Sequence, residues 1–289
     1  MADVAPIEID EALLRAWKLP WPGADSDKEQ RGRVLIVAGS EQLAGTAILS
    51  ATGAMRAGAG KVRIATSACA AVAVAAAMPE ARVLGLQETG GRFEVNAPSL
   101  AAFADRIDCA LIGPGITDES SARELVRSLV PLLEGAAIVL DSAAMVACTD
   151  VRFARPPVLT PHGGEMAHLL GIPKDDVLAD PARIAAEAAR NWNAVVALKG
   201  VVTHVATPGG ELWCNRAGNA GLGTCGSGDV LAGIIAGLAG RGATVAQATV
   251  WGVALHARAG DRLAHRLGTL GYLARELPGE IPALMEALR

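Results

Sequence analysis

The chain has 289 residues, of which 51% are hydrophobic and 3% aromatic, and its formal net charge is −4. That length suits one large α/β domain or two smaller ones. The absence of a basic run argues against a nucleic-acid-binding surface. The five cysteines are scattered and form no Cys-x-x-Cys pair, so the sequence predicts neither structural disulfides nor a zinc ribbon, and it favours a cytoplasmic location.

The predicted elements alternate between short β-branched runs and alanine-rich segments with helical spacing. At the N-terminus, residues 1–32 predict a short helix at 9–17 and a loop, which pack on the domain that follows. The predicted strands are 34–38, 61–66, 109–113, 137–141, 157–160, 194–200 and 202–207. The predicted helices are 46–58, 120–133, 181–192, 229–238 and 245–266. The apolar segment 68–78 is too short to span a bilayer, so no membrane association is expected.

This alternation favours an α/β fold with a mainly parallel central sheet and helices on both faces. No repeat or low-complexity linker divides the chain, and we therefore expect a single domain over residues 1–289. In open parallel sheets, ligands bind outside the carboxyl ends of the strands. The segments that follow strands are therefore the candidate site: 39–45, 113–115, 141–145, 160–165, 199–200 and the glycine-rich stretch 218–233.

The stretch 218–233, GNAGLGTCGSGDVLAG, combines many glycines with one carboxylate, Asp229, where a helix is predicted to begin. A helix start presents free N–H groups and a partial positive charge. We interpret the turn 226–228 as an anion site and Asp229 as a base that deprotonates an attacking hydroxyl. The alternative is that Ser227 caps the helix and Asp229 complements its dipole. A G-x-G-x-x-G match in this stretch lacks the preceding strand and the later acidic residue of a dinucleotide-binding motif.

Polar residues at the other strand ends are further candidates. His162, Glu165 and His168 are spaced three apart, but helical geometry separates the two histidines, so a polar pocket is favoured over a zinc site. Asp141 ends an apolar strand, which is a functional position in open sheets, although it could instead form a turn. Lys199 is either a cation beside a phosphate or a solvated strand end. Three more histidines in apolar or helical settings are expected to be structural: His204, His256 and His265.

Taken together, these motifs resemble one family. The segments RGRVLIVAGS, AGTAILSATGAMRAGAGKV, LIGPGI, VLDSAAM, LTPHGGEMAHLLG, VALKGVVT and GNAGLGTCGSGDVLAGIIAG have the order and spacing of the ADP/ATP-dependent NAD(P)H-hydrate dehydratases. The resemblance covers nearly the whole chain and implies a ribokinase-like fold. It also implies repair of the hydrated cofactors NADHX and NADPHX. In that reaction ADP or ATP phosphorylates the ring hydroxyl, and phosphate then leaves to restore NADH or NADPH.

The resemblance further implies a role for each matching residue. Asp229 is the implied catalytic base, and the amides of the turn 226–228 hold the transferring phosphoryl group. The implied nucleotide contacts are Lys199, Gly200, Val201, Val202, Thr203, Gly226, Ser227 and Gly228. The implied contacts to the hydrated cofactor are Ala44, Gly45, Thr46, Gly115, His162 and Asp229, with Asp141, Glu165 and Asn219 in the same polar pocket. Mg²⁺ is expected to bridge the nucleotide phosphates, and no side chain is assigned as a direct ligand.

The chain departs from the family pattern in three places. The usual His-Pro-Gly-Glu reads His-Gly-Gly-Glu at 162–165, the second acid that usually follows Asp141 is missing, and Cys225 stands where glycine is usual. The residues before the first strand are too few for the epimerase domain that many relatives carry. We therefore expect action on the S epimer alone, beside a separate epimerase. The resemblance also implies a homo-oligomer, because relatives are often tetrameric.

Two other functions stay open. A ribokinase-like small-molecule kinase, acting on a thiazole, a pyrimidine or a sugar alcohol, would leave a stable phosphorylated product. A nucleotide-binding sensor without turnover is kept open by the missing second acid, although the retained Asp229 speaks against it. The TPHGGE segment favours the dehydratase over the kinase.

Overall fold

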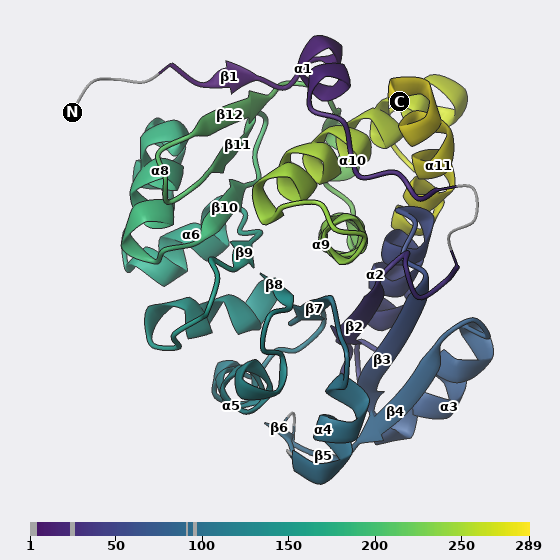
Figure 1. The fold of residues 1–289 in the computed structure, drawn as a ribbon. Helices are drawn as coiled ribbons and strands as arrows, with labels where there is room; N and C mark the ends of the chain where they lie inside the picture. Colours follow the sequence, from purple (N-terminus) through teal and green to yellow (C-terminus); the bar gives the residue numbers. More distant parts are fainter. Residues whose placement is uncertain (1–4, 24–26, 91, 95–96) are drawn as a thin grey trace.

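The computed structural model describes residues 5–23, 27–90, 92–94 and 97–289 (Figure 1). Its strands are β1 (Ile7–Glu8), β2 (Arg33–Val37), β3 (Lys61–Ser67), β4 (Arg82–Leu86), β5 (Glu88–Thr89), β6 (Arg92–Phe93), β7 (Cys109–Ile112), β8 (Ala137–Leu140), β9 (Val158–Leu159), β10 (Val195–Leu198), β11 (Thr203–Ala206) and β12 (Leu212–Asn215). Within the described residues, ten of these strands form one sheet in the order β1-β12-β11-β10-β9-β8-β7-β2-β3-β4, and β5 and β6 form a separate hairpin.

The sheet is mainly parallel. All neighbouring strands from β10 across to β4 pair in parallel, whereas β11 is antiparallel to both of its neighbours, β10 and β12. This arrangement confirms the predicted fold class. It also makes β10 and β11 a hairpin, and the turn at 199–202 is part of the predicted nucleotide-binding segment.

Helices cover both faces of the sheet (Figure 1). The helices are α1 (Glu11–Ala16), α2 (Gly45–Arg56), α3 (Ala68–Ala77), α4 (Ala97–Ala104), α5 (Glu119–Leu129), α6 (Gly163–Leu170), α7 (Lys174–Ala179), α8 (Pro181–Asn191), α9 (Ser227–Gly240), α10 (Val245–Leu267) and α11 (Leu277–Leu288). Short 3₁₀ helices are η1 (Val130–Leu132), η2 (Ser142–Thr149), η3 (Ala220–Leu222) and η4 (Ala274–Glu276). Within the described residues, no helix has the length and apolar character needed to cross a membrane.

The hydrophobic core lies in two layers, one on each side of the sheet. On β2, Val34 and Ile36 pack into the layer formed with α2, α9, α10 and α11, while Leu35 and Val37 pack into the layer formed with α4, α5 and α8. All four side chains are buried, with at most 1% exposed. Such continuous apolar strands are typical of a parallel sheet that is covered on both faces.

Close packing of α2 against α9 fixes where the glycine-rich stretch lies. A Cβ atom at Gly233 would come within 2.1 Å of the Ser50 carbonyl oxygen, and one at Gly237 within 2.5 Å of the Ala54 carbonyl oxygen. Only glycine permits backbones to approach this closely. The middle of α9 is therefore held against α2 by backbone contact rather than by flexible side chains.

The N-terminal segment packs on the end of the sheet. Leu14 of α1 is fully buried in the first core layer. The Trp17 ring stacks on that of Trp213 in β12 with a centroid distance of 5.6 Å. The Trp251 indole N–H donates to the Trp17 carbonyl oxygen at 2.8 Å. These contacts join α1 to β12 and α10.

Candidate active site

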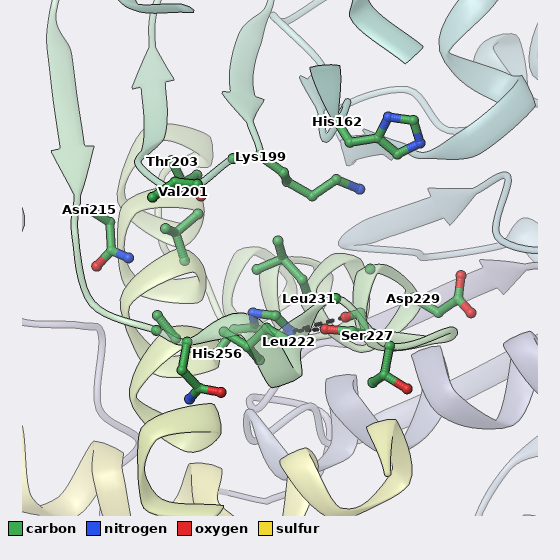
Figure 2. A pocket seen from close by; sticks show the side chains of 18 of the residues that line it. His162, Lys199, Val201, Thr203, Asn215, Leu222, Ser227, Asp229, Leu231 and His256 are labelled. Carbon is green, nitrogen blue, oxygen red and sulfur yellow. Dashed lines mark hydrogen bonds between the residues drawn. The ribbon is translucent and has the colours of Figure 1, made fainter. Parts of the chain in front are cut away.

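A cavity of about 730 Å³ lies where the ends of β8, β10 and β12 face the start of α9. Strand-end residues Asp141, Lys199 and Asn215 line it, together with residues of α9 and α10. Figure 2 shows Lys199 extending from the end of β10 into the space between His162 and the start of α9. This is the position expected of a ligand site in an open parallel sheet.

The start of α9 supplies free backbone donors. Gly226, with φ of 88°, precedes the helix in the left-handed conformation that glycine adopts readily. The Ser227 amide donates to the Thr224 carbonyl oxygen at 3.2 Å, so it is not available to a ligand, contrary to the expectation for this turn. The amides of Gly226, Gly228 and Asp229 have no acceptor among the described residues. Free N–H groups at a helix start form an anion-binding site.

Asp229 sits beside these amides with an altered acidity. Burial raises the pKa of its carboxyl group from 3.8 to about 7, and the negative charges of Asp141 and Glu165 act in the same direction. The positive charge of Lys199 acts against them. A carboxylate with a pKa near the operating pH is suited to general-base catalysis.

Lys199 is held at the anion site by two carboxylates. Its Nζ lies 3.6 Å from Asp141 Oδ1 and 3.9 Å from Glu165 Oε2. A Cβ atom at Gly228 would lie 3.2 Å from the same Nζ, which places the ammonium group directly beside the free amides. Asp141 is itself 2% exposed and accepts a hydrogen bond from the Thr160 hydroxyl. The ammonium group and the amides together offer positive charge to a phosphate.

His162 caps the start of α6 with its side chain. Its Nδ1 accepts hydrogen bonds from the amides of Gly164 at 3.0 Å and Glu165 at 3.1 Å. In return, Glu165 Oε2 accepts from the His162 amide at 2.8 Å, which completes a capping box. Because Nδ1 accepts, the neutral ring carries its hydrogen on Nε2, which lies 3.6 Å from Glu165 Oε2 on the wall of the cavity.

The two histidines of the TPHGGEMAH segment do not share a site. His168 Nε2 lies 2.7 Å from Glu119 Oε1 of α5, whereas His162 lines the large cavity. Among the residues that the structure describes, no group of three or more His, Cys, Asp or Glu side chains is placed to hold a metal ion.

Asn219 lines the cavity and also anchors the glycine-rich stretch. Its Oδ1 accepts from the Gly221 amide and from the Tyr272 hydroxyl, both at 3.0 Å. Its Nδ2 donates to Asp261 Oδ1 at 3.1 Å, and Asp261 Oδ2 accepts from the Gly218 amide at 3.0 Å. Asp261 and Tyr272 had no motif to mark them, because they lie outside any strand end.

His256, which was expected to be structural, lies on α10 and on the wall of the same cavity. Its Nε2 is 2.9 Å from Ser227 Oγ and 3.0 Å from the Ser227 carbonyl oxygen (Figure 2). By contrast, His204 is buried on β11 outside this cavity, and His265 is exposed on α10.

Some predicted substrate contacts lie outside the wall of this cavity. Ala44 and Gly45 begin α2, and the Thr46 hydroxyl donates to the Leu43 carbonyl oxygen at 2.8 Å. Gly115 adjoins the same turn, because a Cβ atom there would lie 2.2 Å from Thr46 Oγ1. These four residues, from 44–46 and 115, thus form one cluster.

Helix α2 connects that cluster to the anion site. A Cβ atom at Gly226 would come within 2.5 Å of Leu49 Cδ1, one turn further along α2. Val202 is also outside the large cavity, and it lines a second cavity of about 480 Å³ beside the β10–β11 turn. The other predicted nucleotide contacts, Lys199, Gly200, Val201, Thr203 and 226–228, line the large cavity.

Comparison with known proteins places the chain in a family. The family model for NAD(P)H-hydrate dehydratase matches residues 34–283. The chain belongs to this family. It is 47% identical over 281 residues to an ADP-dependent (S)-NAD(P)H-hydrate dehydratase of Xanthomonas campestris, covering 97% of this chain and 96% of the relative. It also spans about half of the bifunctional NAD(P)H-hydrate repair enzymes that it matches, for example 54% of the one from Moorella thermoacetica.

Solved structures agree with this assignment. A Bacillus subtilis ADP/ATP-dependent NAD(P)H-hydrate dehydratase, co-crystallised with ATP and Mg²⁺, superposes with a TM-score of 0.88 at 30% identity, covering 100% of both chains. A ribokinase-like superfamily protein of Enterococcus faecalis superposes with a TM-score of 0.82 at 27% identity, covering 98% of this chain and 96% of that one. The ribokinase-like fold that the sequence motifs implied is thereby confirmed for this dehydratase-family chain.

Proposed function

We propose that this chain is a nucleotide-dependent (S)-NAD(P)H-hydrate dehydratase that uses ADP or ATP as its phosphoryl donor. The observation that carries the proposal is the position of Asp229. Its carboxyl group, with a pKa of about 7, adjoins three free amides at the start of α9. The 47% identity to the Xanthomonas enzyme supports the same activity and its S stereochemistry.

In the proposed complex, the nucleotide occupies the side of the cavity formed by the β10–β11 turn and α10. Val201 of the β10–β11 turn lines this side, with Leu222 of η3 and Leu231 of α9 adding apolar surface to the cavity, and Figure 2 shows Val201 on the part of the cavity away from Asp229. The phosphates then reach the start of α9 and the ammonium group of Lys199. Phosphate charge is stabilised there by the N–H groups and by the nearby cation.

The hydrated nicotinamide ring lies between Asp229 and His162 in this proposal. His162 presents its Nε2 hydrogen to an acceptor on the ring, and its Nδ1 bonds keep the imidazole in place. The cluster at 44–46 and 115 binds the remainder of the hydrated cofactor. Because this cluster lies outside the cavity wall, the substrate extends from the cavity towards the start of α2.

The first chemical step is phosphoryl transfer to the ring hydroxyl. Asp229 takes the hydroxyl proton as the hydroxyl oxygen forms a bond to the terminal phosphorus of the nucleotide, and the bond from that phosphorus to the bridging oxygen breaks. The amides of Gly226, Gly228 and Asp229 stabilise the charge on the transferring group. At about pH 7 half of the Asp229 population is already ionised and able to accept this proton.

The second step removes phosphate from the ring. Hydroxide is a poor leaving group, whereas phosphate leaves with the electron pair of the carbon–oxygen bond, assisted by the ring nitrogen. Loss of a ring proton then forms the double bond of the reduced nicotinamide. The cation of Lys199 and the free amides of α9 remain in place to hold the departing phosphate.

The residues of the cavity fit a magnesium ion that is held mainly by the nucleotide. Mg²⁺ is usually bound by one or two carboxylates together with substrate phosphates and water. The carboxylates of Asp141 and Glu165 both line the cavity beside Lys199 and are placed to supply that contribution. A bound Mg²⁺ would neutralise charge on the nucleotide phosphates.

Phosphate release tests the proposed activity against the kinase alternative. The purified chain is incubated with Mg²⁺, chemically hydrated NADH and ADP or ATP, and inorganic phosphate and reduced nicotinamide are both measured. We expect one phosphate per restored NADH, only when nucleotide is present. Nucleotide consumption with a stable phosphorylated product, and no free phosphate, would instead support the small-molecule kinase.

We propose four finer features, each with its own test. A homo-oligomer, expected to be a tetramer, is tested by light scattering of the purified chain. A cytoplasmic location is tested by fractionation of the source cell. Dependence on a separate epimerase is tested by supplying the R epimer alone, which we expect the chain to leave unreacted. A single domain over residues 1–289 is tested by limited proteolysis.

A further inference from the structure

The contact between His256 and Ser227 determines where the hydrogen of a cavity hydroxyl points. Both residues line the large cavity, and both are at least nine-tenths buried, with 9% and 3% exposed, respectively. A single ring atom, His256 Nε2, lies 2.9 Å from Ser227 Oγ and 3.0 Å from the Ser227 carbonyl oxygen. Figure 2 shows the two contacts meeting at this nitrogen.

The carbonyl contact identifies the donor. A carbonyl oxygen only accepts hydrogen bonds, so the 3.0 Å contact requires a hydrogen on His256 Nε2. A protonated Nε2 has no lone pair left to accept from the Ser227 hydroxyl. Ser227 Oγ is therefore a second acceptor for the same N–H, and its own hydrogen is free.

The surroundings keep this arrangement in place. Burial lowers the pKa of His256 to about 4, so the ring stays neutral under ordinary conditions. Within the described part of the chain, Ser227 Oγ is hydrogen-bonded to His256 alone, and because His256 Nε2 is the donor there, no protein acceptor is present for the Ser227 hydrogen. An acceptor for that hydrogen must therefore come from the cavity, which the free amides of Gly226, Gly228 and Asp229 also face.

We propose that the Ser227 hydroxyl donates a hydrogen bond to the phosphate held at the start of α9, and that His256 is the positioning residue that fixes this direction. The identity of the anion rests on the proposed function, in which it is the transferring phosphate of ADP or ATP. The Ser227 amide donates to the Thr224 carbonyl oxygen and cannot serve the anion. The Ser227 hydroxyl takes its place as a donor to the anion. The anion site then has four protein N–H or O–H donors beside the Lys199 ammonium group.

Four variants test the proposal: Ser227→Ala, His256→Leu, His256→Gln and the double variant Ser227→Ala/His256→Leu. Each is compared by kcat/KM for hydrated NADH and by ATP affinity in isothermal titration without the hydrate. Thr249→Val is the matched control, since Thr249 is a buried polar residue of the same helix that is outside the cavity. Thermal unfolding of all variants identifies any loss that is due to instability.

The expected pattern separates positioning from structural support. Ser227→Ala should lower kcat/KM roughly 10- to 100-fold, as for loss of one donor to a developing phosphate charge. His256→Leu should lower kcat/KM in the parent but not further in the Ser227→Ala background. His256→Gln, which retains an N–H donor, should restore most of the activity that His256→Leu loses. Thr249→Val should leave kcat/KM unchanged.

Two outcomes would overturn the proposal. Unchanged kcat/KM and ATP affinity in Ser227→Ala would show that the hydroxyl does not contact phosphate. Additive losses in the double variant would show that His256 acts on something other than Ser227. If the parent chain has no dehydratase activity, the proposed function fails, but ATP affinity still decides this inference: weaker ATP binding by Ser227→Ala supports it, and equal binding refutes it.

Discussion

The ionised carboxylate of Asp229 lowers the stability of the fold. The variant Asp229→Asn tests this directly. The pKa of its carboxyl group is about 7 in the folded chain, against an ordinary value of 3.8. Between these values the folded state binds more protons than the unfolded state, so the free energy of unfolding falls as pH rises through this window. Above about pH 8 the loss is complete and constant.

The size of the effect follows from the two pKa values. At 1.36 kcal/mol for each unit of difference, full ionisation costs the folded state about 4 kcal/mol. Because water still reaches part of this carboxylate, we expect about half of that, ~2 kcal/mol, to be measured. Asp229→Asn mimics the neutral carboxyl group and should therefore be more stable than the parent at about pH 8.

Urea unfolding of the parent and of Asp229→Asn at about pH 5 and pH 8 measures the effect. We expect the free energy of unfolding of the variant, relative to that of the parent, to increase from the lower to the higher pH. The variant should also lose turnover and keep its nucleotide affinity nearly unchanged. The matched control is Asp105→Asn, because Asp105 is an exposed carboxylate outside the cavity. Equal stability of parent and Asp229→Asn at both conditions would refute the assignment of a raised pKa to Asp229.

The remaining predictions concern the same site and its support. In the parent, kcat/KM should rise about tenfold from pH 6 to pH 8 as Asp229 ionises. Lys199→Met should move this rise to higher pH, because the charge of Lys199 lowers the Asp229 pKa. Glu165→Gln should move it to lower pH, because the charge of Glu165 raises that pKa. His162→Ala should lower stability by about 1 kcal/mol through loss of the α6 cap, whereas His162→Asn, an alternative cap, should not; equal losses in urea unfolding would contradict the capping role. Gly233→Ala should destabilise the fold by about 3 kcal/mol or more, because its Cβ would meet the Ser50 backbone. Gly279→Ala, where a Cβ meets nothing within 4 Å, is the control for this change, and similar thermal unfolding of the two variants would refute the close-packing explanation.

Much of the fold was predictable because the apolar runs of a parallel sheet are local signals. The strands at 34–38, 61–66 and 109–113 were predicted within a residue or two of their observed bounds. Elements without such a signal were missed. Strand β1 has two residues and exists through its pairing with β12, and β12 itself has the sequence LWCN between turns. Tertiary pairing, which no local pattern records, decides such strands.

Helix ends show the same division between local and tertiary causes. The predicted helix at 120–133 ends as an α-helix at Leu129, because Pro131 follows and the chain continues as the 3₁₀ helix η1. The helix α9 begins at Ser227, two residues before its predicted start, and extends to Gly240. It packs closely against α2, and the spacing of Gly233 and Gly237 is the sequence signal for that packing.

For the site, motif spacing indicated the strand-end residues but not the residues that hydrogen-bond to the site from other elements. Asp141, Lys199, His162 and Asp229 were predicted as candidates and all line one cavity. His256 was assigned a structural role, because a histidine inside an apolar helix carries no sign of what it faces. Its proximity to Ser227 depends on how α10 packs against α9, 29 residues apart in sequence at this contact.

His162 has a structural role, as the cap of α6, that its sequence motif did not indicate. From the sequence, both His162 and Glu165 were predicted to lie in a polar pocket, and no structural role was predicted for His162. The geometry supplies one, since the imidazole Nδ1 accepts from two amides of α6 as a serine or aspartate cap would. The same side chain therefore serves the fold through Nδ1, while its Nε2 lies on the wall of the cavity.

The most direct test of nucleotide-dependent dehydration by this chain is the absorbance of reduced nicotinamide in a mixture of the chain, Mg²⁺ and chemically hydrated NADH. Addition of ADP or ATP should start growth of the reduced-nicotinamide band, and the two rates identify the preferred donor. The Asp229→Asn variant should give no growth under the same conditions. Absence of growth with either nucleotide, using hydrate that a known dehydratase converts, would show that the chain is not an NAD(P)H-hydrate dehydratase.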